Sequence, residues 1–243
     1  MAKPVMGYWV KAAVVPAAAF LLVACGGGSD GVDEASPELQ YPLRVAYKNL
    51  IEREGTLSAA VSGSATDGED TVQFVGSGSM TESATTGSFE GQMAIVKNLT
   101  VNGDLIVEGI SVPFTNSSKN YFSQSFAPLG TSANGNHCVV RGPFVIPEFV
   151  KVGDSGPFAE VDCYSSSSKS IKIGTSVQTY AIEAASNDGA RLKIVENVKD
   201  TSGGQATSDS VFDISMDGAI RRRSERITFQ DSGITFNMRL NYN

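Results

Sequence analysis

The side chains in this 243-residue chain that are most able to do chemistry on their own are those of its three cysteines and its single histidine. Cys138 and Cys163 would pair in an oxidising compartment. Their spacing is not the Cys-x-x-Cys of redox and zinc sites, and His137 has no second histidine to complete a metal site. We therefore predict a structural disulfide between Cys138 and Cys163. It would close a loop of 26 residues, counted inclusively, and stabilise the fold by about 3 kcal/mol.

Catalysis by these side chains is not expected. His137 is the sole histidine that could act as a base, and no Gly-x-Ser-x-Gly motif accompanies it. Neighbouring strand residues such as His137 and Cys138 point to opposite faces, which argues against a catalytic pair. The acids Asp67, Glu69 and Asp70 indicate a solvated turn rather than a glycosidase pair or a calcium loop. We predict no catalytic, cofactor-binding or metal-binding residues, and no enzymatic activity.

Cys25 has a different context. It closes an apolar run over residues 12–23 that follows Lys3 and Lys11. A basic start, a short apolar stretch and small residues at its end are typical of an export signal. The run is about half the length that a membrane-spanning helix needs. The sequence therefore predicts an exported chain from which residues 1–24 are removed.

Residues 22–25, Leu-Val-Ala-Cys, resemble the lipobox of bacterial lipoproteins. The resemblance implies a diacylglycerol on the Cys25 thiol, cleavage before Cys25 and acylation of the new amino terminus. Two or three acyl chains would hold the protein durably on a membrane. An ordinary signal with an incidental Cys25 is the alternative. Because Gly26 stands where aspartate would favour inner-membrane retention, the resemblance implies the outer membrane, on its periplasmic or surface face.

The charge of the mature chain excludes one class of partner. Removal of Lys3 and Lys11 with the leader leaves 17 basic against 26 acidic side chains. Nucleic acids bind to fields of lysine and arginine, and an acidic protein repels their phosphates. We expect no nucleic-acid partner.

The segment after Cys25 predicts a tether and then a helix. Residues 26–37 are rich in Gly, Ser and Asp and lack apolar periodicity, so with Cys25 they form a lipidated flexible tether with a mean reach of about 20 Å. Pro42 suits the first turn of a helix and Gly55 its end. One apolar stripe, expected to cover a sheet, contains Leu43, Ala46, Tyr47, Leu50 and Ile51.

From Thr56 onward the chain predicts about a dozen long antiparallel strands. Turn signals stand at residues 102–103, 187–189, 202–204, 217–218 and 231–233. The predicted fold is mainly β, a meander or half-barrel of long antiparallel strands with one short N-terminal helix. The strands form either one large sheet or two related modules. The two-module version places the helix and a first module in residues 38–136, and a second module with the disulfide in residues 137–243.

Three parts of the body look like segments shared by uncharacterised bacterial envelope lipoproteins. They are residues 89–92, 150–156 and 163–167. These are turn and strand residues, so the resemblance implies no activity.

The run at residues 221–226 combines four arginines with one acid. Strict alternation puts Arg221, Arg223 and Glu225 on one face of a strand and Arg222, Ser224 and Arg226 on the other. Charges on both faces are typical of an exposed or edge strand. An anion site is the alternative.

Together these features predict a membrane-anchored envelope lipoprotein with a non-enzymatic structural or binding role, whose partners are the membrane and an envelope protein. The alternative is a carrier or chaperone for an apolar ligand such as lipid or lipoprotein. In plan, the chain resembles the lipoprotein-sorting and lipid-binding half-barrel families. A reachable concavity lined by Phe229, Ile234, Phe236 and Met238 would favour the carrier. A dry interior filled by those side chains would favour the scaffold.

Overall fold

A computed structural model describes residues 39–142, 144–186 and 189–243. Cys25, the leader and the tether lie outside these residues, as do two residues of the predicted turn at 187–189. No helix in the described part of the chain is long and apolar enough to span a membrane.

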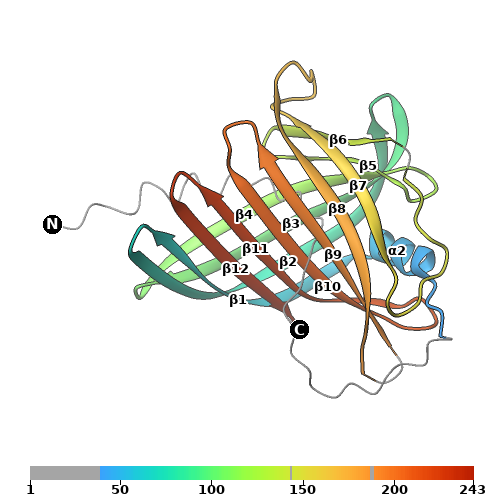
Figure 1. Cartoon of the computed structure of the whole chain (residues 1–243), viewed down its shortest axis with the longest axis horizontal. Helices are drawn as coiled ribbons and strands as arrows, with labels where there is room; N and C mark the ends of the chain where they lie inside the picture. The colour runs from blue at the N-terminus through green and yellow to red at the C-terminus, as the bar shows by residue number, and fades with distance from the viewer. Residues whose placement is uncertain (1–38, 143, 187–188) are drawn as a thin grey trace.

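The described residues form a closed antiparallel barrel of twelve strands (Figure 1). Each strand pairs with its neighbours in sequence, and the first pairs with the last. The strands are β1 (Gly55–Asp67), β2 (Asp70–Phe89), β3 (Gln92–Val107), β4 (Ile110–Phe122), β5 (Pro128–Ala133), β6 (Asn136–Arg141), β7 (Ser155–Tyr164), β8 (Lys172–Ala184), β9 (Ala190–Asp200), β10 (Gln205–Ile214), β11 (Ile220–Asp231) and β12 (Ile234–Tyr242).

This topology confirms the mainly-β antiparallel meander with one short helix. The sheet is closed rather than a half-barrel, because β1 pairs with β12 over nine residues from Ala59 to Asp67. The predicted module boundary between residues 136 and 137 falls inside β6, and both segments supply strands to one barrel. Closure satisfies the backbone groups that two separate sheets would leave unpaired at their edges.

The helix α2 (Leu43–Glu52) follows Pro42, as predicted, and closes one end of the barrel (Figure 1). Its buried residues are Leu43, Ala46, Tyr47, Leu50 and Ile51, which are the five of the predicted stripe. The Tyr47 ring meets Phe122 and Phe158 edge-on, with ring centroids 6.0 and 5.5 Å apart. We call this the helix-bearing end.

The predicted turns at residues 202–204, 217–218 and 231–233 connect successive strands. The turn predicted at Asn102–Gly103 is wrong, because both residues lie inside β3. The actual turn is Glu108–Gly109, with φ of 50° and 82°, as a two-residue hairpin requires. Gly103 serves close packing instead, since an added Cβ would lie 2.6 Å from the Phe114 ring.

Two apolar clusters fill the barrel, one at each end. The first packs around α2, and the second includes Val61, Phe74, Met80 and Leu240. Polar side chains are buried as well. We call the following residues the buried polar belt: Glu82, Lys97, Asn120, Gln178, Glu196, Arg222 and Glu225.

Candidate functional site

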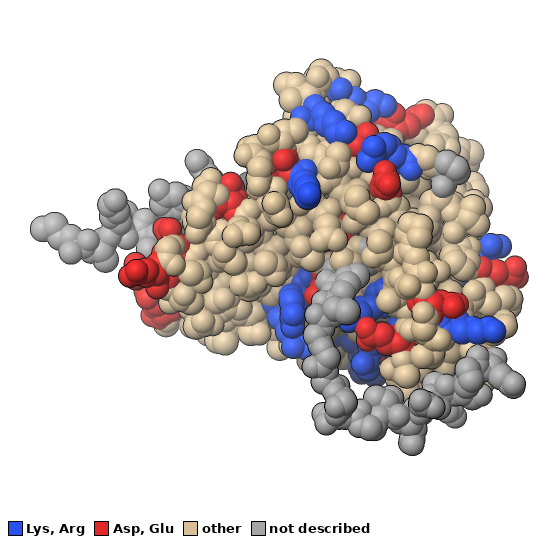
Figure 2. Space-filling model, viewed as in Figure 1, with Lys and Arg blue, Asp and Glu red and all other residues tan. Residues whose placement is uncertain are grey.

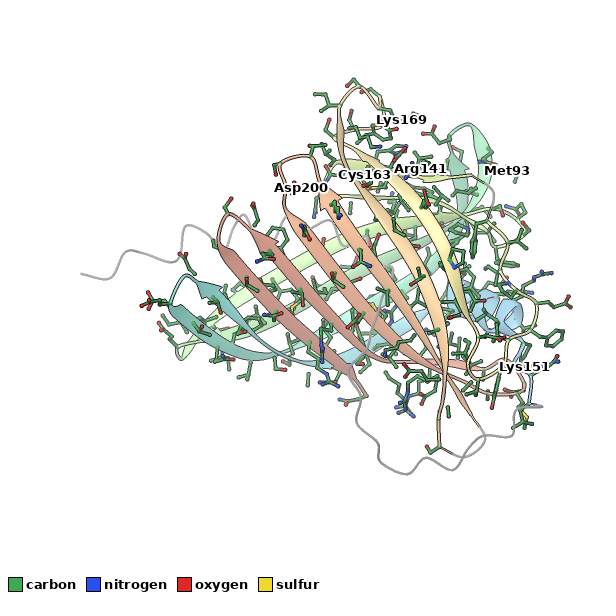
Figure 3. The ribbon with its side chains drawn as sticks, viewed as in Figure 1. Met93, Arg141, Lys151, Cys163, Lys169 and Asp200 are labelled. Atoms are coloured by element: carbon green, nitrogen blue, oxygen red, sulfur yellow. A yellow bond between two sulfur atoms is a disulfide. The ribbon has the colours of Figure 1, made fainter. Side chains whose placement is uncertain are left out.

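The two predicted disulfide cysteines are neighbours across strands. Cys138 on β6 pairs in register with Cys163 on β7, and their sulfur atoms are 2.13 Å apart. Both side chains are buried in the cluster around α2. Figure 3 labels Cys163 in this part of the sheet. The bond therefore joins adjacent strands at a point where the barrel wall contacts the core.

His137 lies on the opposite face of β6 from Cys138, as alternation predicts. Its Nε2 is 2.7 Å from Oε1 of Glu90, which sits in the turn between β2 and β3. Lys169, labelled in Figure 3 in the loop between β7 and β8, pairs with the other Glu90 oxygen. Hydrogen bonds from Lys169 and then His137 lower the pKa of Glu90. These three residues, the Glu90 cluster, tie together three segments that are distant in sequence.

An aromatic stack reinforces the same contact. The Phe89 ring stacks on Tyr121 of β4 and on His137 of β6, with centroids 4.4 and 4.9 Å away. Gly130 makes room for it, because a Cβ there would lie 2.4 Å from the Phe89 ring. The tip of the β2–β3 hairpin is thus held against side chains on the outer face of β4 and β6.

Beside this hairpin tip the outer face is hollowed into a recess of about 620 Å³. Its lining includes Asn98, Thr100, Ser117, Lys119, Ser132 and Asn134. Many of these groups bond to one another across strands. The Thr100 and Ser117 hydroxyls are 3.2 Å apart, and the Tyr121 hydroxyl is 3.0 Å from that of Ser132. We call this the outer recess.

Most of the hydrogen-bonding groups that line the outer recess are hydroxyl and amide groups, and they lie beside the rings of Phe89 and Tyr121. Each such group can both donate and accept hydrogen bonds. The Glu90 charge at its edge is already matched by Lys169 and by contact with His137. Lys119 is an exposed cation on the lining. The volume lies within the range of small-molecule sites. Such a lining suits a neutral ligand that is rich in hydroxyl groups.

The buried polar belt contains an ion network centred on Glu82, which is only 3% exposed. Arg53 Nε, just after α2, lies 2.6 Å from Glu82 Oε2, and Lys97 Nζ lies 3.6 Å from the same oxygen. Burial raises the pKa of Glu82, but the Arg53 hydrogen bond and the charges of Lys97, Arg53 and Arg222 outweigh it and leave the pKa lowered. Burial lowers the pKa of Lys97 to about 8. Lys97 also donates to the Arg53 carbonyl. The network therefore fastens the end of the helix to the barrel wall.

Two residues of the arginine run, Arg222 and Glu225, belong to this belt, whereas Arg221, Arg223 and Arg226 are exposed, as predicted. A register shift opposite Val211 and Phe212 interrupts the alternation of β11. Arg222 and Glu225 are therefore both buried, with Arg222 Nη1 3.5 Å from Glu225 Oε2. The Tyr242 hydroxyl donates to the same oxygen at 3.1 Å. The predicted assignment of these two residues to opposite faces is wrong because a bulge adds one residue to the strand.

Two of the side chains that the carrier alternative needs on a concavity pack within an apolar cluster instead. Phe236 stacks on Phe74 with centroids 5.3 Å apart, and Met238 packs against the same cluster. Phe229 and Ile234 are partly buried near the β11–β12 turn. An internal cavity beside Tyr47 measures about 20 Å³, which is room for about one water-sized probe. By comparison, the outer recess is the larger space.

The outer-recess residues were missed by sequence reasoning. Alternating polar residues on β3 and β4, such as Asn98, Thr100 and Ser117, do indicate an outward face. They do not indicate a hollow, because the hollow depends on where the β2–β3 hairpin tip docks. The acids Asp67, Glu69 and Asp70 lie at the β1–β2 turn, as predicted.

Comparisons with protein-family models, with curated proteins and with solved structures found no match to this chain.

Proposed function

We propose that the protein is a lipid-anchored, non-enzymatic binding protein of the cell envelope that holds a neutral, hydroxyl-rich ligand in its outer recess. A saccharide is the ligand class that fits this description. The observation that carries the proposal is the contrast between the apolar clusters packed inside the barrel and a recess of about 620 Å³ on the outer face whose lining carries many hydroxyl and amide groups. Attachment at Cys25 would keep this recess at the membrane surface.

The carrier alternative is less well supported. A carrier for lipid needs an apolar cavity large enough for acyl chains. In this barrel Phe236 and Met238 pack into the second cluster, and α2 occupies the other end. The outer recess does contain the rings of Phe89 and Tyr121, but hydroxyl and amide groups from β3 to β6 lie around them, so it is not a wholly apolar cavity.

Replacing Cys25 by alanine should move the protein from the membrane fraction to the soluble fraction, because no thiol remains for lipid. Fractionation of cells and partitioning into detergent measure the change. Ser29→Ala in the same tether is the control and should stay with the membrane. Continued partitioning of the Cys25→Ala variant into detergent would contradict the anchor.

The outer recess can be tested with neutral oligosaccharides, such as chitotriose and cellotriose, by calorimetry and by NMR titration. We expect at least one of them to bind, with shifts confined to residues around the recess. The double substitution Thr100→Ala with Ser117→Ala should weaken that binding about thirtyfold, because each hydroxyl removed costs a hydrogen bond of about 1 kcal/mol.

A matched control is available on the other side of the barrel. The Thr228 hydroxyl donates to the Asn237 side chain at 3.0 Å, and neither residue lines the outer recess. Thr228→Ala with Asn237→Ala should therefore leave saccharide binding unchanged. If no neutral saccharide binds, or if native mass spectrometry finds a stoichiometric lipid instead, the proposed ligand class is wrong.

A further inference from the structure

The described chain begins at the helix-bearing end of the barrel. Tyr41 exchanges two backbone hydrogen bonds with Val150, of 2.8 and 3.0 Å. The guanidinium of Arg44 donates to the Ile146 carbonyl at 3.1 Å. The segment before α2 is therefore fixed to the connection between β6 and β7. Lys151, labelled in Figure 3, marks this connection.

Four large apolar side chains are exposed where these segments meet. Val45 of α2, Val145 and Phe149 of the β6–β7 connection, and Met216 of the β10–β11 turn are between 46% and 75% exposed. The β10–β11 turn lies against the helix, because the Asn49 side chain donates to the Gly218 carbonyl at 2.9 Å. We call Val45, Val145, Phe149 and Met216 the apolar rim.

The length of chain before the barrel determines what can cover this rim. Thirteen residues lie between Cys25 and Leu39, and a fully extended chain over this stretch spans at most about 50 Å. A Gly- and Ser-rich segment of this length has a typical reach of only about 20 Å. The far turns lie a further 40 Å or so along β1, at about 3.3 Å per residue. At that typical reach, a lipid on Cys25 favours an orientation in which the helix-bearing end lies nearest the bilayer.

Charge supports the same orientation. Acidic side chains gather at the far tip of the barrel, over the β1–β2 turn, whereas basic and acidic side chains are mixed around the helix-bearing end (Figure 2). The tip carries the exposed acids Asp67, Glu69 and Asp70. Anionic headgroups would repel these acids. At the helix-bearing end the charges are mixed, so there the attraction to the membrane would come from the apolar side chains.

We infer that the apolar rim is a membrane-contacting surface, inserted into the interfacial region of the bilayer that holds the Cys25 lipid. This inference rests on the proposed anchor. Insertion into the bilayer would shield these exposed side chains from water, and the tether places the rim within reach of the membrane. The barrel then stands on its helix-bearing end, with the acidic β1–β2 tip directed away from the membrane.

Tryptophan fluorescence tests the inference, because the only tryptophan, Trp9, lies in the leader. The variant Phe149→Trp places an indole in the rim, and Ile110→Trp places one at a residue of similar exposure beside the far β3–β4 turn. Both are made in the full lipidated protein and reconstituted into phosphatidylcholine vesicles with brominated acyl chains. Circular dichroism confirms that each variant is folded.

We expect brominated lipid to quench the Phe149→Trp indole several-fold more strongly than the Ile110→Trp indole, with a blue-shifted emission. Flotation with the vesicles reports the anchor separately. If the protein floats but both indoles are quenched equally, or neither is quenched, then the proposed contact of the rim with the membrane is wrong and the anchor still stands. A protein that carries no lipid and does not float overturns both.

Discussion

Replacing Glu82 by glutamine should lower the free energy of unfolding by about 3 kcal/mol at neutral pH, because breaking a buried ion pair leaves the remaining charges without compensation. The Glu82 carboxylate lies 2.6 Å from Arg53 and 3.6 Å from Lys97, and its side chain is 2% exposed. Glutamine has nearly the same shape but no charge. Urea denaturation of the disulfide-intact protein, followed by circular dichroism, measures the difference.

A matched exposed pair serves as the control. Glu160 lies 3.1 Å from Arg141, and both side chains are at least half exposed. Because exposed pairs contribute about 0–1 kcal/mol, Glu160→Gln should change stability very little. Equal effects of the two glutamine substitutions would show that the Glu82 network is no stronger than a surface pair.

The Glu82 effect should also depend on pH. The pKa of Glu82 in the folded protein is lowered from the ordinary value of 4.5. A carboxyl with a lowered pKa stabilises the fold above its unfolded-state pKa, and that contribution is lost as pH falls through its folded-state pKa. The stability gap between wild type and Glu82→Gln should therefore be full at neutral pH and shrink below pH 4.5. A gap that stays constant into acid would contradict the ionised network.

The parts of the fold that sequence predicts well are those determined by local periodicity. The five-residue stripe on α2 was predicted in full, because side chains three and four apart share a helix face. The number of strands and their antiparallel order followed from alternation and turn residues. Barrel closure could not be predicted in this way, because the pairing of Ala59 with Tyr242 joins residues at opposite ends of the barrel sequence. No local pattern specifies that contact.

Two local signals were misread for a physical reason. Glycine serves both turns and close packing, and at Gly103 it serves packing against Phe114. A bulge shifts alternation by one residue, and in β11 it brings Arg222 and Glu225 into the interior together. Both features depend on the neighbouring strand, which the sequence of one strand does not reveal.

The outer recess was less predictable than the fold. Its lining comes from β3 to β6, and its depth comes from Phe89, which docks on Tyr121 and His137. The lone histidine was correctly placed opposite Cys138, but its partner Glu90 is 47 residues away in the chain. The disulfide was predictable because the lipobox resemblance assigned Cys25 to a lipid, which left two cysteines to pair.

Truncation of Tyr47 to alanine should cost about 3–5 kcal/mol, the range for deleting a large buried ring. Tyr47 is 1% exposed and packs edge-on against Phe122 and Phe158. Because α2 carries the ring into the end of the barrel, the loss creates a cavity between helix and wall. Tyr164→Ala, at a partly buried tyrosine near the end of β7, should cost much less. Urea denaturation measures both.

The substitution Tyr47→Phe separates the ring from its hydroxyl. Among the described residues, the Tyr47 hydroxyl oxygen has no hydrogen-bond partner, and burial raises its pKa. A buried polar group without a partner costs free energy, so its removal should leave stability unchanged or raise it by about 1 kcal/mol. Phenylalanine retains both edge-on contacts. We therefore expect opposite outcomes at one position, a large loss with alanine and none with phenylalanine. A comparable loss with phenylalanine would mean that the hydroxyl, and not ring packing, secures the helix in the barrel.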